Sequence, residues 1–345
     1  MDTPVEDTSF YDDTVKPVGA VLAQYHDHRN GSRVAQLGGH SNPQTHRGAG
    51  QLPPGAAIVT TLLKSLEENP LFDLRTSSPV SKILLENRKV VGVEYTHSSD
   101  TATLHGPVIF ASGGFASDAY GMIKQYRPNL AGFPSTNDPR PGSQHLLTII
   151  GAQLHDMDLI QVHPTGFVDP EKPESKLKFL AAERLRGEGG ILLLDGKRFV
   201  NEMETREVVT DAITAETPSD ENPKQWDVQL VFDEGAYNVS KSHMDFYLWK
   251  GLMHKTTVAE LGAQAIPTLR EYADAVAHKR EDVLGRKVFG NWTLKDIMVD
   301  SMFYVGRVTP VVQNYTKYFA NPPYGTNRLN LLTLFASSNL SRSNP

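Results

Sequence analysis

The residues that could carry chemistry are concentrated between positions 161 and 206. Histidine, glutamate and arginine recur there among glycines, in the segments QVHPTG (161–166), AERLRGEGG (182–190) and GKRFVNE (196–202). Apolar residues lie on both sides of the middle segment. Because a charge beside a buried strand is costly unless it is paired, we expect some of these groups to face a cleft or one another. Such residue types bind anions and transfer protons, although their spacing alone names no reaction.

Two features of this stretch have a structural interpretation as well as a functional one. Glu183 and Arg186 are three residues apart, so they could form an ion pair on one helical turn. An exposed pair of this kind contributes only about 0–1 kcal/mol and needs no function. His163 could likewise be a structural histidine or a catalytic one. The spacing leaves both alternatives open.

A pair of glycines follows a short apolar run farther upstream. Residues 107–110 read PVIF and predict a buried strand, which ends at the turn ASGGF over 111–115. α/β folds use such a turn to bring backbone close to a cofactor. A tight turn after a core strand is the plainer alternative, since a glycine pair is a weak motif.

Helix signals occur at three places. Apolar residues at helical spacing predict an amphipathic helix over 55–69. Thr257 and Glu260 have the spacing of a capping box, which predicts that a helix begins there. Pro267 is suited to the first turn of a further helix that buries Leu269 and Tyr272.

Strand signals consist of short apolar and β-branched runs at 81–85, 89–95, 191–194 and 227–232. A turn over 86–88 is expected to join the first two of them. The segment 216–225 is rich in proline and acidic residues and predicts an exposed loop.

Composition limits the classes to which the chain can belong. Its 345 residues are enough for two domains, or for one domain with a large insertion. With 39% hydrophobic and 21% charged residues it reads as an ordinary globular protein, and its net charge of -6 gives no reason to expect nucleic acid as a partner. Cysteine is absent, which excludes disulfides, thiol-linked flavin and cysteine-ligated metal centres within this sequence.

The N-terminal segment MDTPVEDTSFYDD is acidic and lacks the basic and apolar parts of a targeting peptide. No stretch approaches the roughly 20 apolar residues of a membrane-spanning helix. We therefore expect a soluble, cytoplasmic protein without membrane contact. A mitochondrial location is the alternative if the N-terminus is truncated.

The three segments between 161 and 206 resemble the signature region of the flavoprotein subunits of fumarate reductase and succinate dehydrogenase. They are most similar to the soluble fumarate reductases, with HPTG, then AE–LRGEGGI, then GKRFVNE–TR in the same order. The similarity extends to LGGHS and THR within 37–47, and to 109–115, 285–290 and 308–312. It thus covers most of residues 33–312.

The resemblance implies reduction of fumarate to succinate, with a hydride from reduced flavin and a proton from an arginine. By position, Arg206 is that acid, and Glu183 and Arg186 form the relay that returns its proton. The carboxylates of the dicarboxylate substrate are expected to bind at His163, Thr165 and Arg328.

The resemblance also implies FAD, bound non-covalently, as the cofactor. Ser112, Gly113, Gly114 and backbone near Val80 are expected to contact it. The electron donor is expected to be NADH or a reduced flavin carrier, and no metal site is expected.

The implied fold is α/β, with an incomplete, Rossmann-like FAD-binding domain at 1–159. An α+β capping domain at 160–310 interrupts it, and 311–345 form a residual return or an irregular tail. The family's opening Gly-x-Gly-x-x-Gly is not found in the sequence. PGSQ at 141–144 occupies the place of a Gly-Asp-Gly whose acid binds FAD in the family, and no histidine follows Pro310 where the family has one for the substrate.

These departures leave other functions open. The chain could be a catalytically inactive, truncated family member or a non-catalytic binding module. Succinate oxidation, aspartate oxidation and ketosteroid dehydrogenation are neighbouring activities on the same frame. Retention of FAD would separate an enzyme from the inactive alternatives.

Overall fold

The structure is a computed structural model that describes residues 32–35, 45–48, 54–154, 156–182 and 184–313. Contacts divide the chain into two compact units, one of residues 1–76 with 339–345 and one of residues 77–338. The first unit contains the antiparallel strands β1 (Ser32–Ala35) and β2 (Thr45–Gly48) and the helix α2 (Pro54–Glu67). The amphipathic helix predicted over 55–69 is thus confirmed.

The second unit begins with a three-stranded antiparallel sheet of β3 (Val80–Glu86), β4 (Lys89–His97) and β5 (Asp100–His105). The predicted turn between the first two strands is present, and it consists of Asn87 and Arg88. Both have positive φ, of 50° and 65°, which is the backbone of the tight turns that suit the twist of a hairpin. The local sequence was therefore sufficient to predict this hairpin.

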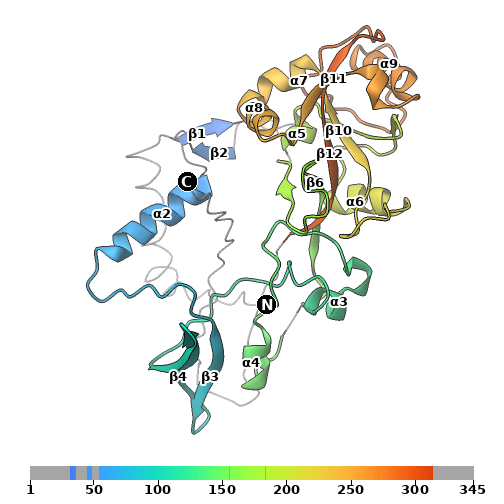
Figure 1. Cartoon of the computed structure of the whole chain (residues 1–345). Coiled ribbons are helices and arrows are strands. Elements are labelled where there is room, and N and C mark those ends of the chain that lie inside the picture. Colours follow the sequence, from blue (N-terminus) through green and yellow to red (C-terminus); the bar gives the residue numbers. More distant parts are fainter. Residues whose placement is uncertain (1–31, 36–44, 49–53, 155, 183, 314–345) are drawn as a thin grey trace, which may run out of the picture. The chain divides into compact units, whose positions relative to one another are not determined.

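A larger sheet occupies the rest of the second unit (Figure 1). Its strands are β6 (Gln161–Phe167), β7 (Phe179–Leu180), β8 (Ile191–Leu194), β9 (Lys197–Arg198), β10 (Val228–Phe232), β11 (His254–Thr257) and β12 (Met302–Gln313). The order is β7-β6-β12-β10-β8-β9, and β11 pairs with β12. The twelve-residue β12 therefore joins strands that lie far apart in the sequence.

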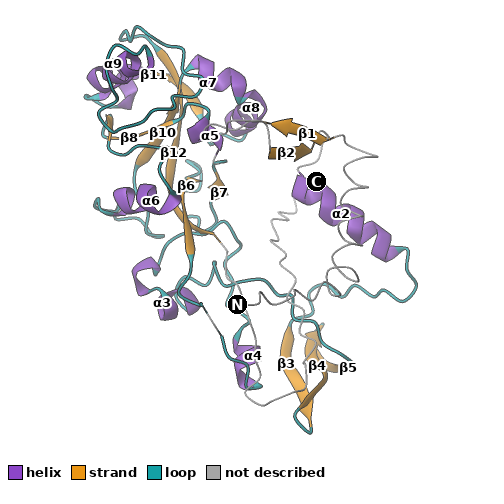
Figure 2. Ribbon diagram, turned by 180° about the vertical axis from the view of Figure 1, so that it is seen from behind, coloured by secondary structure: helices purple, strands orange, loops and turns teal. Residues whose placement is uncertain are grey.

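The α-helices of this unit are α3 (Met122–Tyr126), α4 (His145–Ile149), α5 (Arg184–Gly187), α6 (Arg206–Thr214), α7 (Glu234–Val239), α8 (Lys241–Trp249) and α9 (Ala265–Val276). Short 3-10 helices lie at η2 (Pro128–Leu130) and η3 (Val258–Leu261). Figures 1 and 2 show α6 beside β6 and α9 beside β11. The mixture of helices and sheets is consistent with the expected α/β class.

Both faces of the large sheet are buried, because apolar side chains alternate between two hydrophobic cores. In β8, Leu192 enters one core while Ile191 and Leu193 enter the other. Val209 of α6 and Met244 of α8 belong to the first core, and helix α9 contributes to the second. The predicted strands at 191–194 and 227–232 and the predicted helix around Pro267 are confirmed.

One prediction about local structure is wrong, and a second is confirmed in part. Residues 107–110 form no strand, and the side chain of Ile109 is 60% exposed. No described strand pairs with this segment, so its backbone groups have no ladder to join. The helix predicted to begin at Thr257 is present as the 3-10 helix η3, with Thr257 at its N-cap position. The Thr257 side chain makes no capping hydrogen bond, and Glu260 accepts a hydrogen bond from Thr256.

A buried aspartate fastens the start of α7 to a distant loop. The carboxylate of Asp233 accepts a hydrogen bond from the backbone N–H of Ala236 at 2.9 Å, which caps the helix. It also accepts from the backbone N–H groups of Thr293 and Leu294, at 2.6 and 2.8 Å, and from the Thr293 hydroxyl at 3.0 Å. One side chain therefore satisfies donors in two segments.

We expect Asp233→Ala to lower the free energy of unfolding by about 2–4 kcal/mol, because it removes a cap and leaves buried donors unsatisfied. Urea denaturation followed by tryptophan fluorescence measures the change. Asp274→Ala is the matched control, since among the described residues the Asp274 carboxylate pairs only with Lys279, which is exposed at the surface. Equal midpoints for the two variants would contradict a structural role for Asp233.

Candidate functional site

A cavity of about 630 Å³ lies among the three-stranded sheet, residues 105–114 and residues 140–146. It brings together three of the four predicted FAD contacts, Val80, Ser112 and Gly114. The fourth, Gly113, is adjacent, and its carbonyl accepts a hydrogen bond from Gln144 Nε2 at 3.1 Å. Val80 and Ser112 are more than 30 positions apart in the sequence, and the family resemblance predicted both as FAD contacts. They thus line the same cavity.

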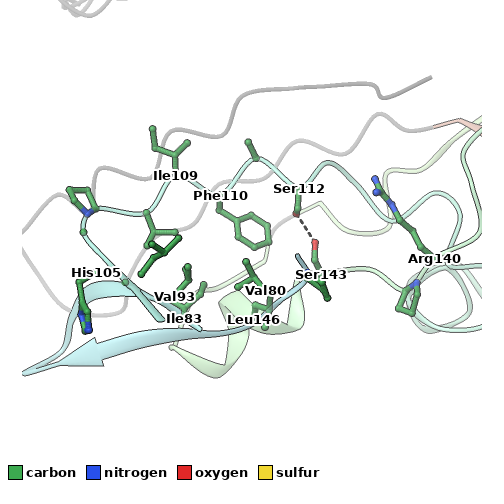
Figure 3. A pocket seen from close by; sticks show the side chains of 18 of the residues that line it. Val80, Ile83, Val93, His105, Ile109, Phe110, Ser112, Arg140, Ser143 and Leu146 are labelled. Carbon is green, nitrogen blue, oxygen red and sulfur yellow. Dashed lines mark hydrogen bonds between the residues drawn. The ribbon is translucent and has the colours of Figure 1, made fainter. Parts of the chain in front are cut away.

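The walls of this cavity are mainly apolar, as Figure 3 shows. Ile83 and Val93 come from the sheet, Phe110 from the segment before the glycine turn, and Leu146 from α4. Gly113 has φ +77°, a conformation that glycine adopts without strain. Apolar walls beside an exposed backbone turn fit the flat ring and ribose of a nucleotide. The described residues therefore fit the adenosine part of FAD.

A second cavity, of about 560 Å³, lies between β6, α6 and residues 127–133. Arg206 forms part of its wall, at the first residue of α6. The Arg206 Nη1 donates to Gln161 Oε1 at 2.5 Å and to Gln313 Oε1 at 3.4 Å. Gln161 and Gln313 are directly opposite each other on β6 and β12. Two neighbouring strands thus hold the guanidinium at the cavity wall.

The second cavity has more basic than acidic side chains in its wall. Arg127 and Lys224 accompany Arg206, whereas Glu207 and Asp211 are the acidic residues. Lys224 Nζ lies 5.4 Å from the ring centroid of Trp226, so an aromatic face supports it. Clustered cations in a cleft attract anions, and guanidinium groups bind carboxylates well.

The other predicted substrate residues in the described part of the chain are buried. His163 and Thr165 are 0% and 1% exposed on β6, and neither is in the wall of the two cavities. The backbone N–H of Thr165 donates to His163 Nδ1 at 3.2 Å. A neutral His163 therefore carries its proton on Nε2. Arg328 lies outside the described residues.

Of the two residues predicted to form the proton relay, Arg186 lies among the described residues. Arg186 on α5 is 4% exposed, and its Nη1 donates to the backbone carbonyl of Glu202 at 2.8 Å. Its own carbonyl accepts from Arg286 Nη2 at 2.8 Å. Glu183 lies outside the described residues. Arg186 is thus built into the buried framework around Glu202.

That framework is a buried network of two arginines and two carboxylates. Arg198 Nη2 and Arg286 Nη1 contact Glu202 Oε2 at 2.8 and 2.9 Å, and Arg198 Nη1 contacts Asp282 Oδ1 at 2.5 Å. The Arg198 guanidinium also lies 4.4 Å from the ring centroid of Tyr272. Some of the charges between positions 161 and 206 were expected to face a cleft or one another, and the pairing of Arg198 with Glu202 confirms this expectation. Nothing in the local sequence indicated Asp282.

The network sets the charge state of its buried groups. Burial by itself raises the pKa of the Glu202 carboxyl, but the hydrogen bond from Arg198 and the charges of Arg286 and Arg198 lower it below its ordinary value. Burial raises the pKa of the Tyr272 hydroxyl. Glu202 is consequently an anion held between two cations.

Comparison with known proteins identifies a matching family. A family described as "FAD binding domain" matches residues 11–311. Fumarate reductase 1 of Saccharomyces cerevisiae is 40% identical over 304 residues, which are 81% of this chain and 62% of that protein. Fumarate reductase of Schizosaccharomyces pombe is 35% identical over 305 residues, 82% of this chain and 57% of that protein.

Solved structures agree on the fold. The open conformation of a flavocytochrome c3 fumarate reductase matches with a TM-score of 0.65 at 24% identity, over 86% of this chain and 51% of that one. The chain thus spans about 60% of the length of the two yeast proteins and about half of the solved one. Among the described residues, no helix combines the length and apolarity needed to cross a membrane.

Proposed function

The chain belongs to the FAD-binding flavoprotein family of the fumarate reductases, and from this premise we propose that it reduces fumarate to succinate. The observation that carries the proposal is the position of the Arg206 guanidinium. Two glutamines hold this group at the wall of a basic cavity. A proton donor must be positioned, and a dicarboxylate needs cations close by. The cavity of about 560 Å³ has a guanidinium held by two side chains and further cations in its wall, which supports the proposal.

In this proposal Val80, Ser112, Gly113 and Gly114 would hold FAD non-covalently, and the reduced form of the flavin would supply the hydride for one alkene carbon while becoming oxidised. Arg206 donates the proton to the other carbon. Arginine stays protonated in water, so this step needs a site that holds the guanidinium still and returns its proton.

We propose that Glu183 and Arg186 return the proton to Arg206, and that His163, Thr165 and Arg328 bind the substrate carboxylates. Arg127 and Lys224 contribute the positive potential that attracts the dianion. Because His163 and Thr165 are buried in the described structure, substrate contact at these residues requires a local opening of the residues that cover them. NADH or a reduced flavin carrier is the proposed electron donor.

Two wider expectations accompany the proposal. The capping domain at 160–310 would close over the flavin and exclude water from hydride transfer. A cytoplasmic location stays a prediction.

The visible spectrum of the purified chain tests the proposal. After FAD is added and the excess removed, we expect a flavin spectrum that a reductant bleaches and fumarate restores. Succinate or aspartate added in place of fumarate to the reduced protein is the control and should leave the spectrum bleached. A folded protein without bound flavin would overturn the proposal and support a non-catalytic binding module.

A further inference from the structure

One end of the 630 Å³ cavity differs chemically from the rest. Arg140, Ser112 and Ser143 are part of the wall at this end, whereas the remaining wall is mainly apolar (Figure 3). The hydroxyls of Ser112 and Ser143 are 2.6 Å apart and hydrogen-bonded to each other. This end therefore offers hydroxyl groups and a guanidinium to a ligand.

The charge of Arg140 is available to a ligand. The residue is exposed, and no carboxylate among the described residues forms an ion pair with it. Other arginines of the same unit are fully engaged, as Arg198 and Arg286 are with Glu202. An exposed arginine beside a cavity can bind an anion without first giving up another partner.

The backbone around Arg140 is stiff. Pro139 and Pro141 flank it, and a residue between two prolines has few accessible backbone conformations. Less conformational entropy is lost on binding when the chain is restricted beforehand. The guanidinium is therefore presented from a restricted loop, even though the side chain itself is exposed.

The loop that carries Arg140 is fastened to the glycine turn. Asp118 Oδ2 accepts a hydrogen bond from the Gly142 N–H at 3.0 Å, and Gln144 Nε2 donates to the Gly113 carbonyl. A Cβ at Gly142 would lie 2.3 Å from Met122 Sδ, so the loop packs closely at this point. These contacts connect the loop that carries Arg140 to the glycine turn that follows Ser112.

We infer that Arg140, with the hydroxyls of Ser112 and Ser143, forms a subsite for the diphosphate of the dinucleotide bound in this cavity. The apolar walls take the adenosine, and the polar end takes the phosphate oxygens. A guanidinium fork matches two phosphate oxygens, and hydroxyls donate to a third. The inference rests on the proposed FAD binding and adds a residue that holds the cofactor.

Binding of nucleotide fragments to the whole apo chain tests the subsite. Isothermal titration with FAD, ADP and adenosine should show that Arg140→Gln weakens binding of FAD and ADP about tenfold or more, the effect of losing hydrogen bonds to a charged group. Adenosine has no phosphate, so its affinity should change less than about twofold. The wild-type affinity for ADP, unlike that for adenosine, should fall as salt increases.

Arg280→Gln is the matched control, because Arg280 is exposed, forms a surface pair with Glu271 and does not line the cavity. It should bind all three ligands as the wild type does. Arg140→Lys keeps the charge but loses the forked geometry of the guanidinium. Its affinity for FAD and ADP should therefore lie between those of the wild type and Arg140→Gln.

The outcomes of this experiment distinguish a failure of the inferred subsite from a failure of the proposed function. If the wild type binds FAD and ADP and Arg140→Gln binds them equally well, the subsite is wrong and the proposed function is untouched. If Arg140→Gln lowers the affinities for ADP and adenosine equally, the substitution has disturbed the whole cavity. This result would also overturn the inferred diphosphate subsite. If the folded wild type binds none of the ligands, both proposals fail.

Discussion

Replacing Arg206 by lysine should abolish most fumarate reduction while FAD remains bound. Lysine retains a positive charge and a proton, but its side chain has a different length and shape, so its ammonium does not occupy the position from which Arg206 Nη1 contacts Gln161 and Gln313. A misplaced donor loses the contribution of general acid catalysis, which is about 10²–10⁴-fold. Steady-state kinetics with excess reductant should therefore show kcat reduced by about that factor.

The division between kcat and KM distinguishes proton donation from substrate binding. If Arg206 is the proton donor, its loss lowers kcat, whereas loss of a purely substrate-binding group would raise KM with kcat unchanged. Arg206→Gln, which has neither charge nor acidity, should be at least as impaired as Arg206→Lys. Arg280→Gln at the surface is the control and should retain wild-type kinetics.

FAD binding must be measured in the same variants. The Arg206 guanidinium lies at the 560 Å³ cavity, and the predicted FAD contacts lie at the 630 Å³ cavity. We therefore expect the flavin content of both Arg206 variants to match the wild type. An active Arg206→Gln enzyme would exclude Arg206 as the acid and would leave the FAD assignment standing.

Glu202→Gln should be the most damaging substitution for stability. The carboxylate is fully buried between Arg198 and Arg286, and Asp282 forms an ion pair with the guanidinium of Arg198. Glutamine has nearly the same shape but leaves two buried cations against one anion. Removing one partner of a buried ion pair costs about 3–5 kcal/mol, because an uncompensated charge remains. Urea denaturation monitored by tryptophan fluorescence should show this loss.

A surface pair provides the matched control. Glu271→Gln breaks the pair with Arg280, whose side chains are 39% and 46% exposed, so it should cost no more than about 1 kcal/mol. Near-equal costs for Glu202→Gln and Glu271→Gln would mean that the buried network contributes no more than a surface pair. Trp292, which packs 5.0 Å from the Tyr272 ring centroid, reports on unfolding near the network.

The lowered pKa of Glu202 also predicts a pH dependence. Its folded pKa lies below its ordinary value of 4.5, so the stabilisation is fully present above pH 4.5. It is lost as the pH falls through the folded pKa, where the carboxylate takes up a proton. The difference in stability between wild type and Glu202→Gln should therefore be greatest near neutral pH and narrow below pH 4.5. If the difference in stability between the two proteins stays constant over this pH range, the lowered pKa of Glu202 is contradicted.

The sequence by itself determined the elements whose signals are local. The β3–β4 hairpin follows from two alternating runs and a short polar turn, and α9 follows from Pro267 and the spacing of Leu269 and Tyr272. The family resemblance also placed Val80, Ser112 and Gly114 in one group, and they line one cavity. Residues within one segment, or within one shared motif, interact in ways that do not depend on the rest of the chain.

The tertiary structure decided which distant residues meet. Gln313 contacts Arg206 because the register of β6 and β12 sets it opposite Gln161, and Asp282 reaches Arg198 across 84 residues. Residues 107–110 have the composition of a strand but form none, since no described strand pairs with them. Hydrogen-bond ladders, buried charge pairs and cavity walls each need a partner from elsewhere in the chain. Strand register and packing supply that partner, and no local pattern encodes either one.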